Sequence, residues 1–214
     1  MGYIRKIDKI EKVAAAPLTG ICGSALLRTP CGPRRADSIR PGDLVVTRDN
    51  GLQPVQLIWK REIDPTEILG RPGNAPVTLN PRAIGPMMPQ KPLTLAPDHR
   101  VLIPGYQLAS QAAETGGLVE ARALAGLNDG SFFDRDARNE PFYNLIFDQH
   151  EIVVASGLPV ASFLPSGALL PRVDETTRSE LVRKFPALRQ KSAKAFPPVA
   201  YPTVQRKDYI QKSA

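Results

Sequence analysis

Short apolar runs separated by turn residues make up most of the chain between residues 24 and 167. Four of these runs have the length and composition of β-strands: residues 25–29, 43–47, 55–60 and 77–79. Asp49-Asn50-Gly51 predicts a tight hairpin between the second run and the third, because both central residues of the favoured turn tolerate a positive φ. The pattern therefore predicts an all-β fold.

The two ends of the chain follow a different pattern. Ile4, Ile7 and Ile10 recur at near-helical spacing, which predicts a short amphipathic helix over residues 2–14. Thr177-Arg178-Ser179-Glu180 has the form of a capping box and predicts a helix from about residue 178 to residue 185. We therefore divide the chain into an N-terminal segment (1–18), a β domain (19–170) and a helical, proline-rich tail (171–214).

The positive charge lies in that tail. The formal net charge is +7, and residues 176–214 hold nine Lys or Arg against two Asp or Glu, which accounts for all of it. Residues 1–175 carry no net charge, so the body of the chain lacks the electrostatic footprint of a nucleic-acid-binding surface. The same boundary leads us to expect that the β domain folds without residues 176–214.

The sequence offers no membrane span, because no run approaches the roughly 20 apolar residues that a span needs. Residues 1–16 have no signal-peptide core, so we expect a cytoplasmic protein, or one exported by a route without an N-terminal signal. Cys22 and Cys31 lack the spacing of zinc ligands, and we expect free thiols and no metal or organic cofactor.

The two histidines of the chain have similar surroundings. His99, in Ala96-Pro97-Asp98-His99-Arg100-Val101, and His150, in Asp148-Gln149-His150-Glu151-Ile152, each lie between two apolar runs. A sheet can direct an imidazole at such a junction into a cleft. Each could equally be an ordinary turn or core histidine.

Taken together, five blocks of sequence resemble the Hint (hedgehog/intein) domain, in its compact bacterial type. They cover residues 19–167 in the family's order: Thr19-Gly20-Ile21-Cys22 through Thr29-Pro30-Cys31-Gly32, Ile39-Arg40-Pro41-Gly42-Asp43-Leu44-Val45, the His99 segment, Leu118-Val119-Glu120-Ala121-Arg122-Ala123-Leu124, and Phe147-Asp148-Gln149-His150-Glu151 with Ser156-Gly157-Leu158-Pro159-Val160. The resemblance implies a flat, horseshoe-like all-β fold followed by the helical tail.

The resemblance also implies self-processing chemistry, of which this chain keeps only part. In the family, a cysteine at the start of the domain attacks the preceding carbonyl, and a histidine protonates the leaving nitrogen. His99 matches that histidine and His150 matches the family's second one. The family's cysteine aligns with Gly20, so Cys22 comes two residues late, and Ala96 replaces the hydroxyl residue that precedes the histidine by three.

We therefore expect a self-processing Hint domain whose N–S acyl shift is weak or lost. One alternative is active cleavage at Ile21-Cys22 by Cys22 and His99, and another is a degenerate fold that binds a protein partner. A basic-tail protein that contacts nucleic acid or an anionic membrane ranks last. The expected partners are the chain's own N-terminal segment as a cis substrate, or an unknown protein, with the domain a monomer and no nucleic acid bound.

Overall fold

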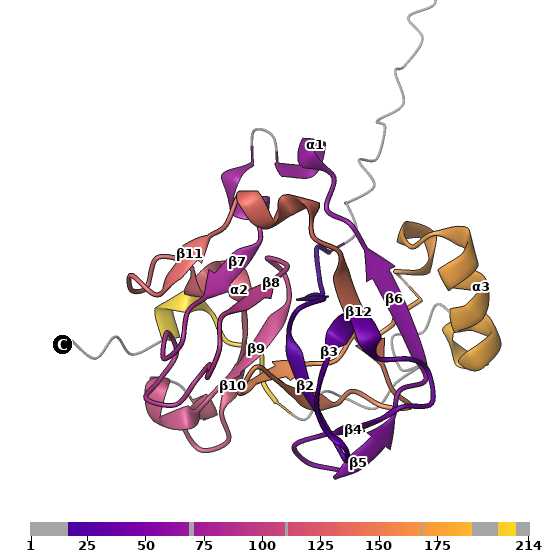
Figure 1. Cartoon of the computed structure of the whole chain (residues 1–214), viewed down its shortest axis with the longest axis horizontal. Helices are drawn as coiled ribbons and strands as arrows, with labels where there is room; N and C mark the ends of the chain where they lie inside the picture. The colour runs from indigo at the N-terminus through magenta and orange to yellow at the C-terminus, as the bar shows by residue number, and fades with distance from the viewer. Residues whose placement is uncertain (1–16, 69–70, 110, 168, 190–200, 209–214) are drawn as a thin grey trace, which may run out of the picture.

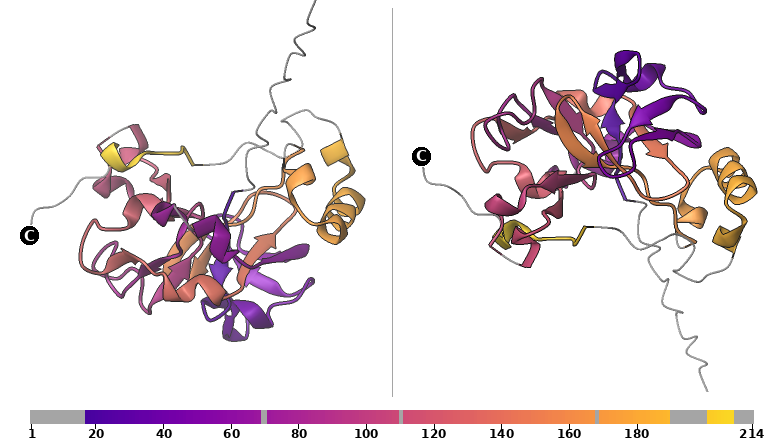
Figure 2. Two further views of the ribbon diagram at one scale, coloured as in Figure 1. Left: turned by 90° about the horizontal axis from the view of Figure 1, so that it is seen from above. Right: turned by 90° about the horizontal axis from the view of Figure 1, so that it is seen from below.

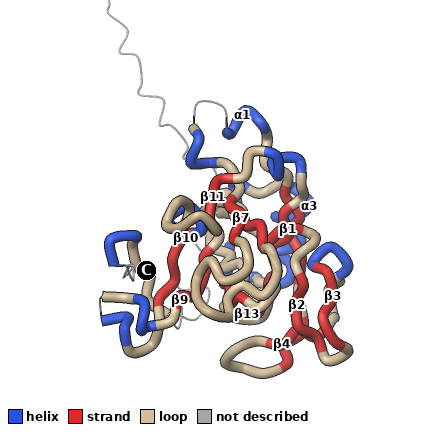
Figure 3. Tube along the Cα trace, turned by 60° about the vertical axis from the view of Figure 1, so that its left-hand side comes forward, coloured by secondary structure: helices blue, strands red, loops and turns tan. Residues whose placement is uncertain are grey.

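The computed structural model describes residues 17–68, 71–109, 111–167, 169–189 and 201–208, so the helix expected over residues 2–14 lies outside the described residues. Strands cross the middle of the molecule and short helices lie around it (Figure 3). The expected all-β fold class is confirmed. The strands and α-helices are β1 (Ile21–Cys22), β2 (Leu26–Thr29), β3 (Gly32–Arg35), β4 (Leu44–Val46), β5 (Leu52–Pro54), β6 (Leu57–Arg61), α1 (Pro65–Ile68), β7 (Val77–Leu79), β8 (Leu93–Leu95), β9 (Arg100–Ile103), β10 (Gly117–Glu120), α2 (Ala121–Leu124), β11 (Ser131–Phe133), β12 (Phe142–Ile146), β13 (Ile152–Ala155), β14 (Leu158–Ala161) and α3 (Glu175–Lys184).

Two six-stranded sheets and one hairpin hold the strands (Figure 1). The first sheet has the order β11-β7-β8-β1-β12-β6, the second has the order β10-β9-β14-β13-β2-β3, and β4 pairs with β5. The short strand β1 lies between β8 and β12, with Ile21 opposite both Leu95 and Tyr143. This pairing brings the start of the domain beside segments far along the sequence.

The hairpin predicted at Asp49-Asn50-Gly51 is present, but its second strand differs from the expected one. β4 pairs with β5, and the pairing continues to Val55, whose N–H donates to the Asp43 carbonyl (2.9 Å). The chain then leaves the hairpin, and β6 pairs with β12 in the first sheet. The run predicted at 55–60 is therefore divided, because Val55 is buried beneath the hairpin whereas Leu57 begins the sheet strand.

The helix of the tail begins earlier than predicted. α3 spans Glu175–Lys184, and its N-cap is Asp174, whose carboxylate accepts from the Thr177 N–H (2.9 Å). An aspartate satisfies a free N–H of the first turn as well as a threonine does, and its charge also favours the helix N-terminus. The capping-box pattern thus located the helix but misplaced its start.

The tail packs on the β domain at two places (Figure 2). Leu181 and Leu188 are buried in a cluster with Trp59 of β6 and with Phe163, whose ring packs edge-on against Trp59 at 5.1 Å. At the other side, Thr203 forms a parallel bridge with Leu118 of β10. Removal of residues 176–214 would expose both surfaces, so the charge boundary seen in the sequence is not a packing boundary. Among the helices that the structure describes, none is long and apolar enough to cross a bilayer.

Candidate functional site

The segment that precedes β1 is fixed beside the turn that carries His99. The Leu18 N–H donates to Asp98 Oδ2 (2.7 Å), the Asp98 N–H donates to the Leu18 carbonyl (2.9 Å), and the Ala96 N–H donates to the Gly20 carbonyl (3.0 Å). On its other side the turn is held by α2, because the Ala121 N–H donates to the His99 carbonyl (2.8 Å). The turn is therefore anchored by backbone bonds on both sides.

The Thr19–Gly20 peptide group is held at both ends by side chains. Its N–H, which belongs to Gly20, donates to His99 Nδ1 (3.1 Å). Its carbonyl, which belongs to Thr19, accepts from Asn144 Nδ2 (3.1 Å). Asn144 lies on β12 and is only 1% exposed. One peptide bond is thus positioned between an imidazole and a carboxamide.

The direction of the Gly20 bond determines the state of His99. Because Nδ1 accepts a hydrogen bond, the proton of the neutral imidazole must lie on Nε2. Burial, with a smaller contribution from the nearby His150, lowers the pKa of His99 to about 3. His99 is 5% exposed, and its Nε2 is a buried atom with no hydrogen-bond partner among the described residues.

Gly20 occupies a backbone conformation that a side chain would disturb. Its φ is +130°, and a Cβ at this position would lie 2.7 Å from Phe142 Cβ and 3.2 Å from Asn144 Nδ2. Few L-residues adopt such a φ, and real Cβ atoms do not approach each other so closely. The close approach of the backbone to β12 therefore depends on glycine.

His150 lies in the turn before β13 and lines the same cavity as His99. Burial lowers the pKa of His150 to about 4, with a further contribution from the positive charge of Arg100. Its acidic neighbours bond elsewhere, because Glu151 accepts from Asn50 Nδ2 (3.0 Å) and Asp148 accepts from Gln56 Nε2 (2.8 Å). His150 is thus a neutral imidazole directed at the cleft rather than a partner of those carboxylates.

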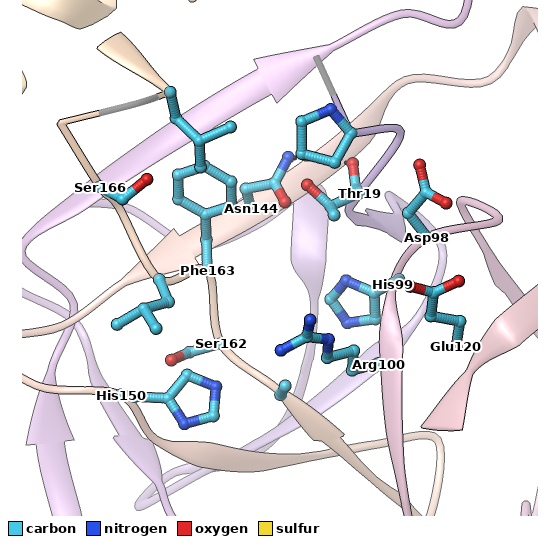
Figure 4. Close-up of a pocket in the computed structure, with 14 residues that line it drawn as sticks. Thr19, Asp98, His99, Arg100, Glu120, Asn144, His150, Ser162, Phe163 and Ser166 are labelled. Carbon is cyan, nitrogen blue, oxygen red and sulfur yellow. Dashed lines mark hydrogen bonds between the residues drawn. The ribbon is translucent and has the colours of Figure 1, made fainter. Parts of the chain in front are cut away.

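The cavity has a volume of about 530 Å³ and is partly open to solvent. Figure 4 shows the side chains that line it. Polar side chains from several parts of the chain meet around it, and Phe163 and Leu164, which follow β14, add apolar surface. It is lined by Pro17, Thr19, Asp98, His99, Arg100, Glu120, Asn144, His150, Ala161, Ser162, Phe163, Leu164, Ser166 and Leu169.

Comparison with known proteins identifies the family. The model of the Hint domain matches residues 21–167, which is more than half of the chain. The chain belongs to the Hint domain family.

Solved structures of the same kind are also similar to this Hint domain. The gp41-1 intein is 12% identical and covers 66% of this chain and 97% of its own, with a TM-score of 0.40. The bacterial intein-like domain from Clostridium thermocellum is 13% identical and covers 68% and 98%, with a TM-score of 0.44. The MchDnaB-1 intein is 11% identical and covers 67% and 99%, with a TM-score of 0.37. Among curated proteins no sequence matches.

The Hint domain places the two cysteines away from the histidines. Cys22 is 4% exposed and belongs to an apolar cluster with Leu18, Ile63, Ala96 and Phe142. Its Sγ lies 3.4 Å from Ser24 Oγ and 4.0 Å from Glu140 Oε2, and it does not line the cavity. Cys31 is an exposed free thiol. Of the predicted site residues, the structure brings His99 and His150 together but not Cys22.

The hydroxyl partner expected before His99 has no replacement nearby. Ala96 is fully buried in the same cluster as Cys22. Thr94, the next residue on that face of the strand, shares a hydrogen bond with Thr78 (2.8 Å) and does not line the cavity. The carbonyl of Thr19 is instead contacted by Asn144, which sequence reasoning missed. An asparagine within the otherwise apolar run Phe142-Tyr143-Asn144-Leu145-Ile146 was the available signal.

Proposed function

We propose that this Hint domain holds the Thr19–Gly20 peptide bond in its cleft without cleaving it through a thioester, and that it acts by binding. The observation that carries the proposal is the paired contact of that peptide group with His99 and Asn144, at a residue that has no side chain. This hydrogen bond connects His99, which matches the family's histidine, with Gly20, which aligns with the family's cysteine.

The missing sulfur is the first reason. An N–S acyl shift requires a thiolate near the carbonyl carbon, with the reacting atoms within about 3 to 3.5 Å. Gly20 offers no nucleophile, and Cys22 contacts Ser24 in a separate apolar cluster. The alternative bond, Ile21-Cys22, lies within β1 between two neighbouring strands, and His99 is already bonded to Gly20.

The second reason is the proton on His99. A leaving nitrogen must receive a proton, yet His99 Nδ1 carries none to give, because it accepts a hydrogen bond from the N–H of the intact amide. With a pKa of about 3, only about 1 in 10⁴ of the His99 side chains is protonated at pH 7. The hydrogen bond therefore stabilises the intact peptide group and does not assist the release of its nitrogen.

Intact mass spectrometry tests the proposal. Purified wild-type protein, Cys22→Ala and the matched control Cys31→Ala are incubated with a small thiol or with hydroxylamine at pH 6 to 8. We expect all three proteins to remain full-length. A fragment that begins at residue 20 would contradict the proposal, and one that begins at residue 22 and is lost in Cys22→Ala alone would establish the cleavage alternative.

A further inference from the structure

The cavity beside His99 gathers polar atoms that lack partners. Three of the buried side-chain atoms without a hydrogen-bond partner in the described residues belong to Thr19, His99 and Asn144, and all three residues line this cavity. Buried polar groups in native proteins are nearly always hydrogen-bonded, to protein, water or a ligand. The presence of all three residues in the lining of one cavity indicates a site for a polar ligand.

His99 and Arg100, which are neighbours in the sequence, can each donate a hydrogen bond to an anion in the cavity. His99 Nε2 carries the imidazole proton, because Nδ1 accepts from Gly20. Arg100 is the next residue, and its half-buried side chain extends into the region between the two histidines (Figure 4). Its guanidinium forms neither a hydrogen bond nor an ion pair within the part of the chain that the structure describes.

The acidic residues of the wall are already paired with another arginine. Asp98 contacts Arg122 through a short ion pair, and Glu120 lies 3.8 Å from Arg122 Nε. Glu120 is directly opposite Arg100 across β9 and β10, yet the two do not form an ion pair. Arg122 does not line the cavity, so Arg100 is the cation presented to a ligand.

The rest of the lining complements the body of such a ligand. Asn144 Oδ1 is an acceptor without a donor, and Thr19 Oγ1 can also accept. Phe163, Leu164 and Leu169 form an apolar wall. The volume of about 530 Å³ is typical of sites for small organic ligands, which usually combine an apolar wall with a few placed polar groups.

We infer that this cavity binds the carboxylate of an N-acylated apolar amino acid, as found at the C-terminal end of a peptide, with Arg100 and His99 Nε2–H donating to the carboxylate. Asn144 Oδ1 then accepts from the ligand's amide N–H, and the apolar side chain packs on Phe163. The inference rests on the proposed function in one respect, because an intact Thr19–Gly20 bond forms part of the wall.

Calorimetric titration of the full chain with matched probes tests the inference. N-acetyl-leucine carries every proposed group, N-acetyl-leucinamide lacks the charge, and 4-methylpentanoate lacks the amide. We expect the acid to bind at least about 10-fold more tightly than the amide, because hydrogen bonds to charged groups are the stronger ones. A tripeptide that ends in leucine distinguishes a peptide terminus from a free acylated amino acid as the preferred source.

Substitution locates the site. Arg100→Gln should weaken binding of the acid about 10- to 100-fold, whereas Arg28→Gln, which removes an equal charge from an exposed position on β2, should change it less than about twofold. Binding should also move the NMR resonance of the His99 Nε2–H proton.

Three outcomes would each overturn the inference. They are equal affinities for acid and amide in the wild-type protein, no binding of any probe at millimolar concentration, and full affinity in a folded Arg100→Gln variant. Intact mass of the same samples reports the Thr19–Gly20 bond separately, so failure of the proposed function is distinguishable.

Discussion

Gly20 and Cys22 are two residues apart and both lie close to Phe142, yet only Gly20 contacts a histidine of the cavity. Gly20 contacts a histidine and approaches an asparagine at the edge of a polar cavity. Cys22 lies in an apolar cluster with Ala96 and Phe142. Side chains two residues apart point to the same face only in a regular strand. The φ of +130° at Gly20 lies outside the strand region, so the alternation of β1 does not extend back to the cleft.

This comparison shows that the chain differs from the family pattern in its packing as well as in the absent sulfur at position 20. At Gly20 the backbone approaches Phe142 so closely that a Cβ has no room. At position 96 an alanine is buried against the same cluster that holds Cys22. The two departures from the family pattern therefore both lie against the apolar cluster that contains Cys22 and Phe142.

The largest expected effect comes from adding a side chain at Gly20. Gly20→Ala should lower the free energy of unfolding by about 2 to 6 kcal/mol, the sum of backbone strain and overpacking of about 1 to 3 kcal/mol each. Gly42→Ala is the matched control, since its φ of +94° is also positive but no atom lies within 4 Å of a Cβ there. It should lose only the strain part. Urea unfolding of both variants measures the difference.

The double variant Gly20→Cys with Ala96→Thr sharpens the same comparison by restoring both family residues. We expect it to be destabilised and to stay full-length by mass spectrometry, because the cysteine cannot enter the observed backbone without displacing β12. A fragment that begins at residue 20 would show that β1 rearranges to accept the side chain, and would remove the contrast between the two positions.

The sequence predicted the elements well where local chemistry determines them. The run at 77–79 is β7, and the turn Asp49-Asn50-Gly51 forms a hairpin, because short-range rules control such features. The blocks that resemble the Hint domain placed His99 and His150 at one cavity.

Features that depend on long-range contacts could not be predicted in the same way. The hydrogen bond from Asn144 to the Thr19 carbonyl requires β1 and β12 to be neighbours, although 125 residues separate Asn144 from Thr19 in the sequence. The burial of Leu181 and Leu188 against Trp59 likewise depends on where the tail folds back. The charge pattern placed a boundary at the start of the tail, but charge carries no information about which apolar faces pack together.

Acidification should lower the stability of the folded protein through His99, the residue that bonds to Gly20. The folded-state pKa of about 3 lies below the unfolded value of about 6.5, so between these pH values the unfolded chain binds more protons. Stability therefore falls as pH falls through this window, by up to about 1.4 kcal/mol per pH unit from this histidine, or about 2 kcal/mol between pH 6.5 and 5.

Urea unfolding at several pH values measures this slope. His99→Gln should remove most of the His99 contribution, and His150→Gln should remove part of the remainder, because the pKa of His150 is lowered to about 4. Cys22→Ser, on the other side of β1, should leave the slope unchanged. An equal slope in wild-type protein and His99→Gln would mean that His99 takes up a proton in the folded state, and its hydrogen bond with Gly20 would then need another direction.

The smallest expected effect concerns Cys22 itself. Cys22→Ala should cost about 1 kcal/mol of stability, because it removes one buried sulfur from a packed cluster, whereas Cys31→Ala should cost almost nothing at an exposed turn. In the wild-type protein a thiol reagent should label Cys31 at once and Cys22 only at the rate of unfolding, since a 4% exposed thiol is inaccessible. Fast labelling of both thiols under native conditions would mean that Cys22 is presented to solvent, as a working nucleophile must be. Slow labelling that follows the unfolding rate would instead leave Cys22 a buried member of the apolar cluster with Ala96 and Phe142.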